Sequence, residues 1–458
     1  MTGVQTCALP ILIHYTAGVN ATVERYLSGS SEAWHLLSTP VTSQAISGSW
    51  TPEGSYPDGS GYDIYVYDEA SNTYVNRKNT IANPIGDGPR FDDESINGGL
   101  NFVTGKGYMV AFQTVGEAKS FTGTLNEGII YMPLLSKVGT SIYAGSNLVG
   151  NPYPSSIDWK SLMGVDFTGV RTETGGGKQF YIWNQTANNF GVYNSENAGD
   201  DGTNGASRYI APMQGFWVAA ATNGGELGFD NDARVHSSQA WLKASTATNP
   251  SLVIRTTAPE TIGYDEIILE FGHESSIGGA SKKFSFVTTA PSLYMEKGTE
   301  KFSISYLTDV TSNPEIPLAF KPGTNGVYTL SVPSGLEAFE RVTLHDLAIG
   351  VTRELKQNPV YTFTAAEGDA PNRFKLTFGS VGSIEWPTSH PSVYYASGAL
   401  HFVNAPAEKH LEVFNLAGQS VIFAKTLADV YPVALSAGIY IVKMTTAQQT
   451  LRIKIIVK

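Results

Sequence analysis

Cysteine is almost absent from the chain: Cys7 is the single one among 458 residues. One thiol cannot form a disulfide within the chain or a multi-thiolate metal site. Positive charge is also scarce, with 30 Lys and Arg against 41 Asp and Glu and no basic cluster, which excludes a nucleic-acid partner. No apolar run approaches the roughly 18–20 residues of a membrane span, so no transmembrane segment is predicted.

Signatures of catalysis and cofactor binding are missing as well. The eight histidines are scattered, and no two stand at the i,i+2 or i,i+4 spacing of metal ligands. The chain has no G-x-S-x-G elbow, no G-x-x-x-x-G-K-[ST] phosphate loop and no convincing dinucleotide fingerprint after a strand. We therefore expect no catalytic residues and no bound cofactor in this chain.

What the chain does contain is glycine (47 residues), tyrosine (23 residues) and many Thr, Ser and Asn. This composition is typical of short strands joined by tight turns, and it predicts an all-β, multidomain protein. Together with the acidic balance and the near-absence of cysteine, it fits an exported bacterial protein.

Three pairs of segments repeat in the same order at an offset of about 110 residues, which indicates a duplicated unit. "WHLLSTPV" (34–41) matches "SNLVGNPY" (146–153), "IYVYDEASNTY" (64–74) matches "FYIWNQTANNF" (180–190), and "GKGYMVAF" (105–112) matches "MQGFWVAA" (213–220). In the first copy of the repeat, Ile64 and Val66 alternate with Tyr65 and Tyr67, which predicts a strand with two apolar faces.

Glycine and proline punctuate the repeat. Gly107 and Gly215 precede strands at matched places, where a missing side chain permits close backbone approach. In "NPYPSSIDW" we expect Ser155 or Ser156 to cap one short helical turn.

Regular short runs follow between about residues 251 and 378 and predict a β-sandwich. They read "SLVIRTT", "DEIILEF", "KFSFVTT", "KFSISYL", "GVYTLSV", "RVTLHDL", "YTFTAA" and "RFKLTF". "GSVGSIEWPTSHPS" (379–392) has two prolines and no periodicity, and is interpreted as a linker. The last 66 residues predict a third, small sandwich, in which Leu451, Ile453, Ile455 and Val457 point inward along the final strand.

This last segment resembles the type A C-terminal sorting domain of the bacterial type IX secretion system, a Gram-negative export route. The resemblance rests on an apolar strand with an Asn-Leu-x-Gly turn, then Leu-x-x-Gly-Ile-Tyr and a basic final strand. The matching residues are Asn415, Leu416, Gly418, Leu435, Gly438, Ile439, Tyr440, Val442, Lys443, Lys454 and Lys458.

The resemblance implies an immunoglobulin-like sandwich that acts as a sorting signal and is cleaved off on export. It implies passage through the periplasm and an outer-membrane translocon, then release or attachment to surface lipopolysaccharide. The segments 12–242 are similar to stretches that recur in large adhesin-like surface proteins carrying this signal.

The first eleven residues, "MTGVQTCALPI", contain no basic n-region and so do not form a secretory signal. Back-translated with a GTG start, they match a common sequencing-adapter oligonucleotide, so we expect natural sequence to begin near Leu12 and a signal peptide to belong to a missing N-terminal part. The expected layout is then 1–11 adapter, 12–128 and 129–242 repeat units, 243–380 β-sandwich, 381–392 linker and 393–458 sorting domain.

Two ligand sites are conceivable. In "NAGDDGTNG" (197–205), Asp200, Asp201 and Asn204 offer hard oxygen donors suited to calcium, although Asp-Gly and Asn-Gly also serve simply as turns. Strand aromatics could build a sugar-stacking platform or could simply be core and cross-strand pairs. They are Trp34, Trp50, Tyr62, Tyr65, Tyr67, Tyr181, Trp183, Phe216 and Trp217.

The sequence therefore predicts a non-catalytic secreted or cell-surface protein with a structural or adhesive role. Two alternatives remain: the C-terminal portion of a secreted hydrolase whose catalytic domain lay upstream, and a glycan-binding module for a host or surface ligand.

Overall fold

The computed structural model is nearly all β, which confirms the predicted fold class. It describes residues 17–27, 31, 33–53, 63–113, 116–141, 143–161, 164–235, 250–259, 262–274, 278–311, 314–379, 392–396, 398–403, 408–415, 418–445 and 450–457. The adapter-like opening and residues 380–391 of the expected linker lie outside them. The chain divides into two compact units, 1–380 and 381–458.

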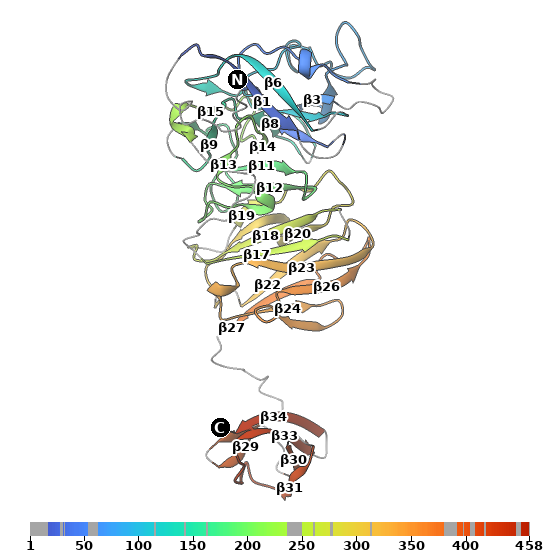
Figure 1. Cartoon of the computed structure of the whole chain (residues 1–458), viewed down its shortest axis with the longest axis vertical. Helices are drawn as coiled ribbons and strands as arrows, with labels where there is room; N and C mark the ends of the chain where they lie inside the picture. The colour runs from blue at the N-terminus through green and yellow to red at the C-terminus, as the bar shows by residue number, and fades with distance from the viewer. Residues whose placement is uncertain are drawn as a thin grey trace, which may run out of the picture. The chain divides into compact units, whose positions relative to one another are not determined.

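Two four-stranded sheets of the first unit share one topology, and strands of both sheets are labelled in Figure 1. The first has the order β2 (His35–Leu37), β5 (Tyr108–Ala111), β3 (Asp63–Asp68) and β4 (Thr73–Asn76). The second has the order β8 (Ser146–Gly150), β14 (Gly215–Ala219), β11 (Gln179–Asn184) and β12 (Asn189–Asn194). Each strand thus occupies the place of its counterpart in the matched segments, as a duplicated unit predicts.

Both sheets have two apolar faces. Ile64 and Val66 belong to one core, with Trp50 at its centre, and their counterpart Phe180 belongs to a second core around Trp159. The alternate residues Tyr65 and Tyr181, with neighbours from both sheets, meet in a third cluster that also includes sandwich residues. The predicted alternation is therefore real, and the second face packs against the rest of the unit rather than against water.

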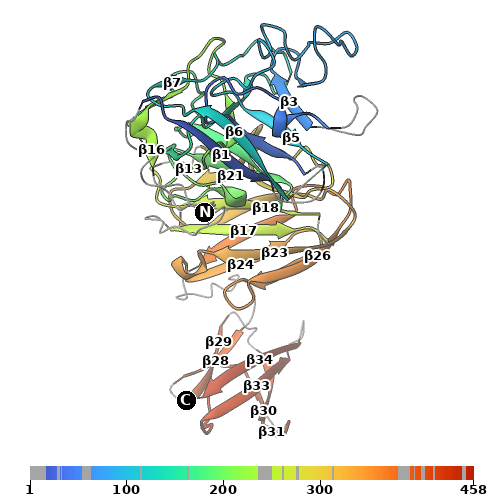
Figure 2. The ribbon, with the colours of Figure 1, turned by 45° about the horizontal axis from the view of Figure 1, so that its top comes forward.

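Shorter strands and turns complete the two repeats. They are β1 (Asn20–Leu27), β6 (Glu117–Thr124), β7 (Ile130–Tyr131), β9 (Ser156–Asp158), β10 (Val165–Asp166), β13 (Tyr209–Ile210), β15 (Gly228–Phe229) and β16 (Arg234–Val235), with 3-10 turns η2 (Gly48–Trp50), η3 (Thr203–Gly205) and η4 (Asn231–Ala233). β1 and β6 form a two-stranded antiparallel ribbon, visible beside each other in Figure 2.

The sandwich is one eleven-stranded sheet folded over a single core. Its order is β25 (Val351–Glu354), β24 (Arg341–Asp346), β27 (Phe374–Gly379), β22 (Glu315–Lys321), β20 (Ser292–Lys297), β21 (Glu300–Tyr306), β18 (Tyr264–Glu270), β17 (Ser251–Thr257), β23 (Gly326–Ser334) and β26 (Val360–Ala365), with β19 (Gly278–Ser281) on β21 and the 3-10 turn η5 (Leu336–Ala338) after β23. Leu318 and Leu376 from one half pack with Leu252 and Leu330 from the other.

Two local predictions are wrong. Ser155 and Ser156 do not cap a helical turn, since Ser156 begins strand β9, which pairs with β13 and β16. The run "KFSFVTT" (283–289) is not a strand: β19 ends at Ser281 and the chain then runs irregularly to β20. The other seven predicted sandwich runs are strands.

The second unit pairs β31 (Ser420–Thr426), β30 (Lys409–Asn415), β33 (Gly438–Thr445) and β34 (Thr450–Val457) in one sheet. A second sheet holds β28 (Ser392–Ala396), β29 (Ala399–Val403) and β32 (Val430–Pro432). Their shared core contains Leu400, Leu411, Val442 and Ile455. This unit is thus a small all-β body with its own core.

Candidate functional site

Lys283 lies among aromatic rings contributed by the second repeat. Its Nζ atom is 4.7 Å from the ring centre of Trp217, 5.2 Å from Phe190, 5.5 Å from Tyr181 and 5.9 Å from Tyr143. An ammonium over a ring face is attracted by the ring quadrupole. In the described ranges no carboxylate is paired with this ammonium, and burial lowers the pKa of Lys283 to about 8.

Tyrosines extend this cluster to the surface. The ring of Tyr67 lies 4.8 Å from that of Trp217, and the ring of Tyr74 lies 5.3 Å from that of Tyr67. Tyr74 is 40% exposed and Tyr143 is 49% exposed, whereas Trp217 is buried. We call Tyr67, Tyr74, Tyr143, Trp217 and Lys283 the aromatic patch. Burial also raises the pKa of Tyr67 to about 12, so its hydroxyl stays protonated at neutral pH.

Tyr67 and Trp217 are members of this patch, but the other aromatic residues predicted from sequence are not. Trp50 and Phe216 are fully buried in the repeat cores, and Tyr65, Tyr181 and Trp183 are buried in the cluster between the sheets. Trp34 is half-buried against Tyr65, and Tyr62 lies outside the described residues. The core alternative is therefore correct for most of them. Tyr74, Tyr143 and Lys283 were missed, because nothing in their sequence neighbourhoods relates them to one another.

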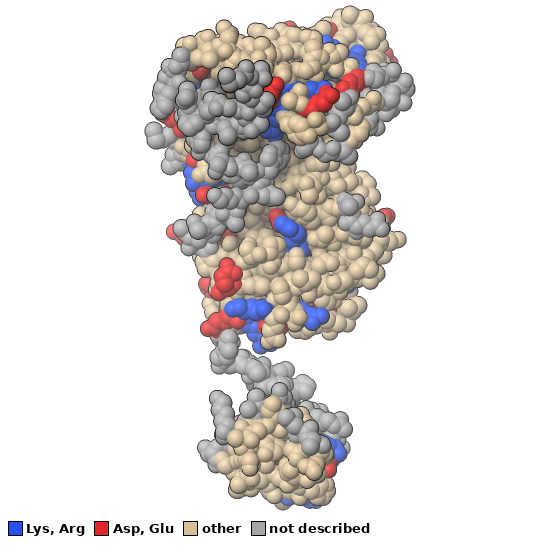
Figure 3. Space-filling model, in the orientation of Figure 1, with Lys and Arg blue, Asp and Glu red and all other residues tan. Residues whose placement is uncertain are grey.

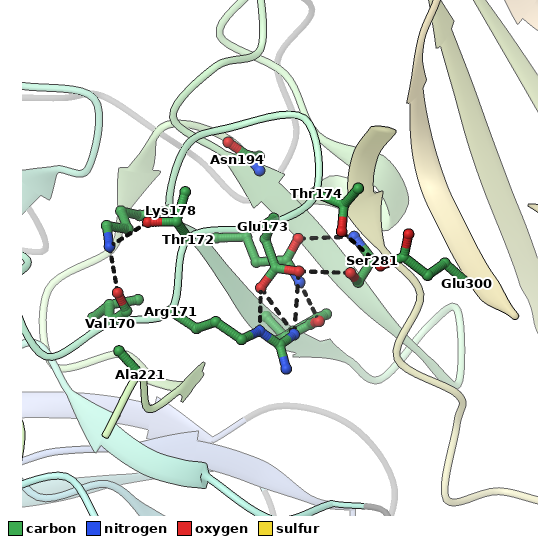
Figure 4. Close-up of polar contacts among 12 residues, drawn as sticks. Val170, Arg171, Thr172, Glu173, Thr174, Lys178, Asn194, Ala221, Ser281 and Glu300 are labelled. Carbon is green, nitrogen blue, oxygen red and sulfur yellow. Dashed lines mark hydrogen bonds and ion pairs between the residues drawn. The ribbon is translucent and has the colours of Figure 1, made fainter. Parts of the chain in front are cut away.

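A polar contact joins the second repeat to the sandwich (Figure 4). The carboxylate of Glu173 accepts hydrogen bonds from Arg171 at 2.9 Å and from Ser281 Oγ at 2.6 Å. Next to it, Thr174 Oγ1 donates to Glu300 at 2.6 Å. Gly278 fits this contact because it has no Cβ, which would stand 1.7 Å from the Thr174 carbonyl oxygen. The loop 171–178 is thus clamped on β19.

We call the region where the second repeat contacts the sandwich the junction. Deeper in it lies a fully buried ion pair. Lys282 Nζ is 2.5 Å from Asp265 Oδ2, and both side chains are inaccessible to solvent. Asp265 Oδ1 accepts a hydrogen bond from Asn204 Nδ2 at 2.8 Å, and Asp265 Oδ2 accepts another from the Leu293 backbone N–H at 2.7 Å. The backbone N–H of Asn204 donates to Glu266 at 2.6 Å.

The three residues proposed as calcium ligands each bind a different protein partner. The Asp200 carboxylate accepts from Arg208 at 3.0 Å, and the Asn204 amide is directed at Asp265. Asp201 forms a bridge to Ser207 through the backbone. Within the described segments, no group of three or more His, Cys, Asp or Glu residues is placed to hold a metal ion.

The described histidines have local partners. His273 stacks on Tyr306 with ring centres 4.4 Å apart and lies 3.2 Å from the carboxylate of Glu270. His345 contacts Thr377 at 2.9 Å, and burial lowers the pKa of this imidazole, which favours its neutral form. Contacts of this kind are typical of histidines with a structural role.

The described sorting-motif residues lie on β30, β33 and β34 and in the turns beside them. Gly418, in a left-handed conformation with φ +77°, closes the turn after Asn415 by donating to the Asn415 carbonyl oxygen at 2.9 Å. Leu435 packs on the core, Gly438, Ile439 and Tyr440 begin β33, and Lys443 Nζ is 3.2 Å from Glu412. Lys454 stands opposite Ile441 on β34. Leu416 and Lys458 lie outside the described residues.

In the part of the chain that the structure describes, no helix has the length and hydrophobicity that a membrane span requires. The face shown in Figure 3 carries few charged side chains over the sandwich, and much of that surface is neutral. Chemically, the junction can hold two β-rich parts rigidly together, and the aromatic patch can contact a planar or apolar ligand face.

Comparisons with known proteins give two matches. A family model described as "Domain of unknown function (DUF8693)" matches residues 15–378. The chain is also 25% identical over 311 residues to the "Minor fimbrium subunit Mfa5" of Porphyromonas gingivalis. The match covers 62% of this chain and 25% of that protein, so the chain spans about a quarter of the relative's length.

Proposed function

The chain belongs to the family described as a domain of unknown function (DUF8693), and from this premise we propose that it is a structural or adhesive protein of the bacterial surface. The observation that carries the proposal is the similarity to a fimbrium subunit over 62% of the chain. A nearly all-β architecture without a recognised catalytic motif agrees with such a role.

The proposal includes the export route. The second unit carries the residues that resemble a type IX sorting domain, and it has a core of its own. A separately folded terminal unit is suited to being bound by a translocon and then removed without disturbing the body that it delivers. We place the cleavage in the linker, residues 381–391, upstream of β28, and the delivered body at the cell surface or on lipopolysaccharide.

An edge strand of the second unit offers a contact for the export machinery. β31 lies at the edge of its sheet, and Phe423 and Val421 on it are 79% and 45% exposed. Exposed apolar side chains on an unpaired edge are characteristic of surfaces that a partner covers. This strand is our candidate for recognition by the sorting machinery.

The export proposal is tested by deleting residues 393–458 in a host that has a type IX system. Surface display, measured as protease accessibility on intact cells, should fall to background while the protein accumulates in the periplasm. Phe423→Lys tests the edge strand alone, and Tyr74→Ala, in the other unit, is the matched control. Normal display of the deletion variant would refute the sorting assignment.

The aromatic patch favours a second candidate function, the binding of a glycan. Tyr74 and Tyr143 are partly exposed, and the ring of Tyr143 lies 5.9 Å from the ammonium of Lys283, an arrangement in which a sugar face can stack on the tyrosine rings. A glycan array on the full chain tests this function. Binding that is lost in Tyr74→Ala and kept in Tyr26→Ala, a change of another exposed tyrosine, would support it.

A further inference from the structure

The buried group formed by Lys282, Asp265 and Asn204 has the components of an amide-exchange reaction. One carboxyl group contacts two side-chain nitrogens: Lys282 Nζ lies 2.5 Å from Asp265 Oδ2, and Asn204 Nδ2 lies 2.8 Å from Asp265 Oδ1. Asp265 therefore bridges a potential nucleophile and a potential leaving group. We propose that Lys282 and Asn204 become joined by an isopeptide bond, with Asp265 as the catalytic carboxyl group.

The surroundings favour this chemistry. The side chains of Lys282 and Asp265 are shielded completely from solvent, and Asn204 is buried as well. Separated charges are costly away from water, so a proton can pass from the ammonium to the carboxylate and leave the amine with a free lone pair. An amine in this form is a competent nucleophile toward a carbonyl carbon.

Asn204 is held in place by several contacts. Its Nδ2 also donates to the Phe190 carbonyl oxygen at 2.8 Å, and its backbone N–H is bonded to Glu266. The residue adopts a left-handed conformation with φ 48°, and its Oδ1 atom is buried and accepts no hydrogen bond from the described residues. The amide is thus fixed in one orientation with its carbonyl group free of competing donors.

The reaction balances without an added reagent. The Lys282 amine attacks Cγ of Asn204, so an Nζ–Cγ bond forms while the Cγ–Nδ2 bond breaks. Asp265 takes a proton from Nζ and delivers one to Nδ2, which leaves as ammonia and carries away as ammonium the proton that Lys282 first gave to Asp265. The products are one amide bond and one ammonium ion, and the chain becomes lighter by about 17 Da.

The bond would join two different parts of the first unit. Asn204 belongs to η3 of the second repeat, and Lys282 follows β19 of the sandwich. A covalent link between them restricts the unfolded chain as a disulfide does. In a protein without a pair of cysteines, it would supply the cross-link that a disulfide supplies elsewhere. The inference does not depend on the export route or on ligand binding.

The test is peptide mapping of the purified full chain after denaturation and trypsin digestion. Trypsin does not cut after an acylated lysine, so residues 256–283 should remain one peptide and be linked to residues 179–208. We expect tandem mass spectrometry to find this branched product at about 17 Da below the sum of the two peptides. The wild-type protein suffices for this measurement.

Variants then assign the roles. Lys282→Arg keeps a cation beside Asp265 but removes the amine, and Asn204→Ala removes the acyl group, so each should abolish the branched product. Asp265→Asn should abolish or slow its formation, whereas Lys283→Met, a change of the neighbouring lysine, should leave it intact.

Three results would overturn the proposal. The first is recovery of peptide 179–208 and the cleaved lysine peptides separately from folded wild-type protein. The second is a loss of about 17 Da confined to peptide 179–208, which would be a succinimide at Asn204–Gly205. The third is an unlinked peptide 256–283 that is about 18 Da lighter, because Lys282 and Asp265 lie in the same peptide and an amide between them would close a ring within it, which would be a different bond.

Discussion

Gly107 and Gly215 occupy equivalent places in the two four-stranded sheets, and each brings its backbone against the first strand of the opposite sheet. A Cβ on Gly107 would lie 2.4 Å from the Val149 carbonyl oxygen, and one on Gly215 would lie 2.7 Å from the Leu37 backbone nitrogen. The backbone N–H of Gly107 donates to the Leu148 carbonyl oxygen at 3.1 Å. Near Gly215, the backbone N–H of Ser38 donates to the Met213 carbonyl oxygen at 2.9 Å.

Gly107→Ala and Gly215→Ala should therefore each destabilise the first unit. The added methyl group meets backbone atoms that cannot move aside, and such overpacking costs about 1–3 kcal/mol. Denaturant unfolding followed by tryptophan fluorescence would measure the loss. Gly88→Ala is the control, because no atom lies within 4 Å of its Cβ position and its free energy of unfolding should change by less than about 0.5 kcal/mol. Equal stability of all three variants would contradict the close approach.

The stability of the first unit should rise with pH because of Lys283. The folded-state pKa of Lys283, about 8, is below the ordinary lysine value of 10.5, so between these values the unfolded chain binds more protons than the folded one. Stability contributed by this group therefore increases from pH 8 toward pH 10.5, by about 1–3 kcal/mol. The comparison of wild type with Lys283→Met isolates the effect from tyrosine ionisation. Replacement of exposed Lys321 by Met should leave the slope unchanged; an unchanged slope in Lys283→Met would refute the prediction.

Trp217 should matter for stability far more than its neighbour Tyr74. Trp217 is 3% exposed and contacts Tyr67, Tyr74 and Lys283, so Trp217→Ala leaves a large cavity and should cost about 3–5 kcal/mol. Tyr74 is 40% exposed, and Tyr74→Ala should cost only about 1 kcal/mol. Thermal unfolding of both variants checks the difference. A comparable loss from Tyr74→Ala would mean that the aromatic patch is a structural element rather than an accessible surface.

In the sandwich, the buried pair of Asp346 and Arg373 should be sensitive to the loss of one partner. Arg373 donates to both carboxylate oxygens, at 2.8–3.2 Å, and Tyr361 adds a hydrogen bond at 2.9 Å. Asp346→Ala leaves the guanidinium buried without its carboxylate and should cost about 3–5 kcal/mol.

Glu315→Ala provides the control for that variant. Glu315 pairs with Lys375 on the surface of the same sheet, and its removal should cost at most about 1 kcal/mol. Urea unfolding of the two variants at one pH gives the comparison. Similar values for both would show that Asp346 and Arg373 gain little from their burial.

The repeat and its strands could be predicted because they leave local signals. Ile64 and Val66 alternate with Tyr65 and Tyr67, and the same alternation returns at Phe180, so the period of a strand is visible in both copies. The segment 283–289 shows the limit of that signal. Phe284 and Phe286 alternate there without a strand, because Ser285 Oγ donates to the Asn188 carbonyl oxygen and accepts from the Val287 N–H, which replaces ladder hydrogen bonds.

The junction and the aromatic patch could not be predicted for a different reason. Lys282, Asp265 and Asn204 come from three separate segments, and only the packing of the second repeat on the sandwich brings them together. Each alone is an ordinary polar residue in a Gly- and Asn-rich chain. Likewise, Tyr143 meets Lys283 only in the folded chain, and Tyr74 is related to Lys283 through Trp217.

The reciprocal contacts between the two sheets also indicate how the chain evolved. When a surface on one subunit packs against the equivalent surface on another, each contact between residues i and j is repeated between j and i. This is the arrangement of a two-fold symmetrical dimer. Gly107, packed against β8, and Gly215, packed against β2, make this arrangement within one polypeptide. Fusion of two identical subunits would produce it directly. Met109 stands opposite Tyr65 in the first sheet, whereas its counterpart Trp217 stands opposite Tyr181 in the second, so the two halves have since diverged at this position.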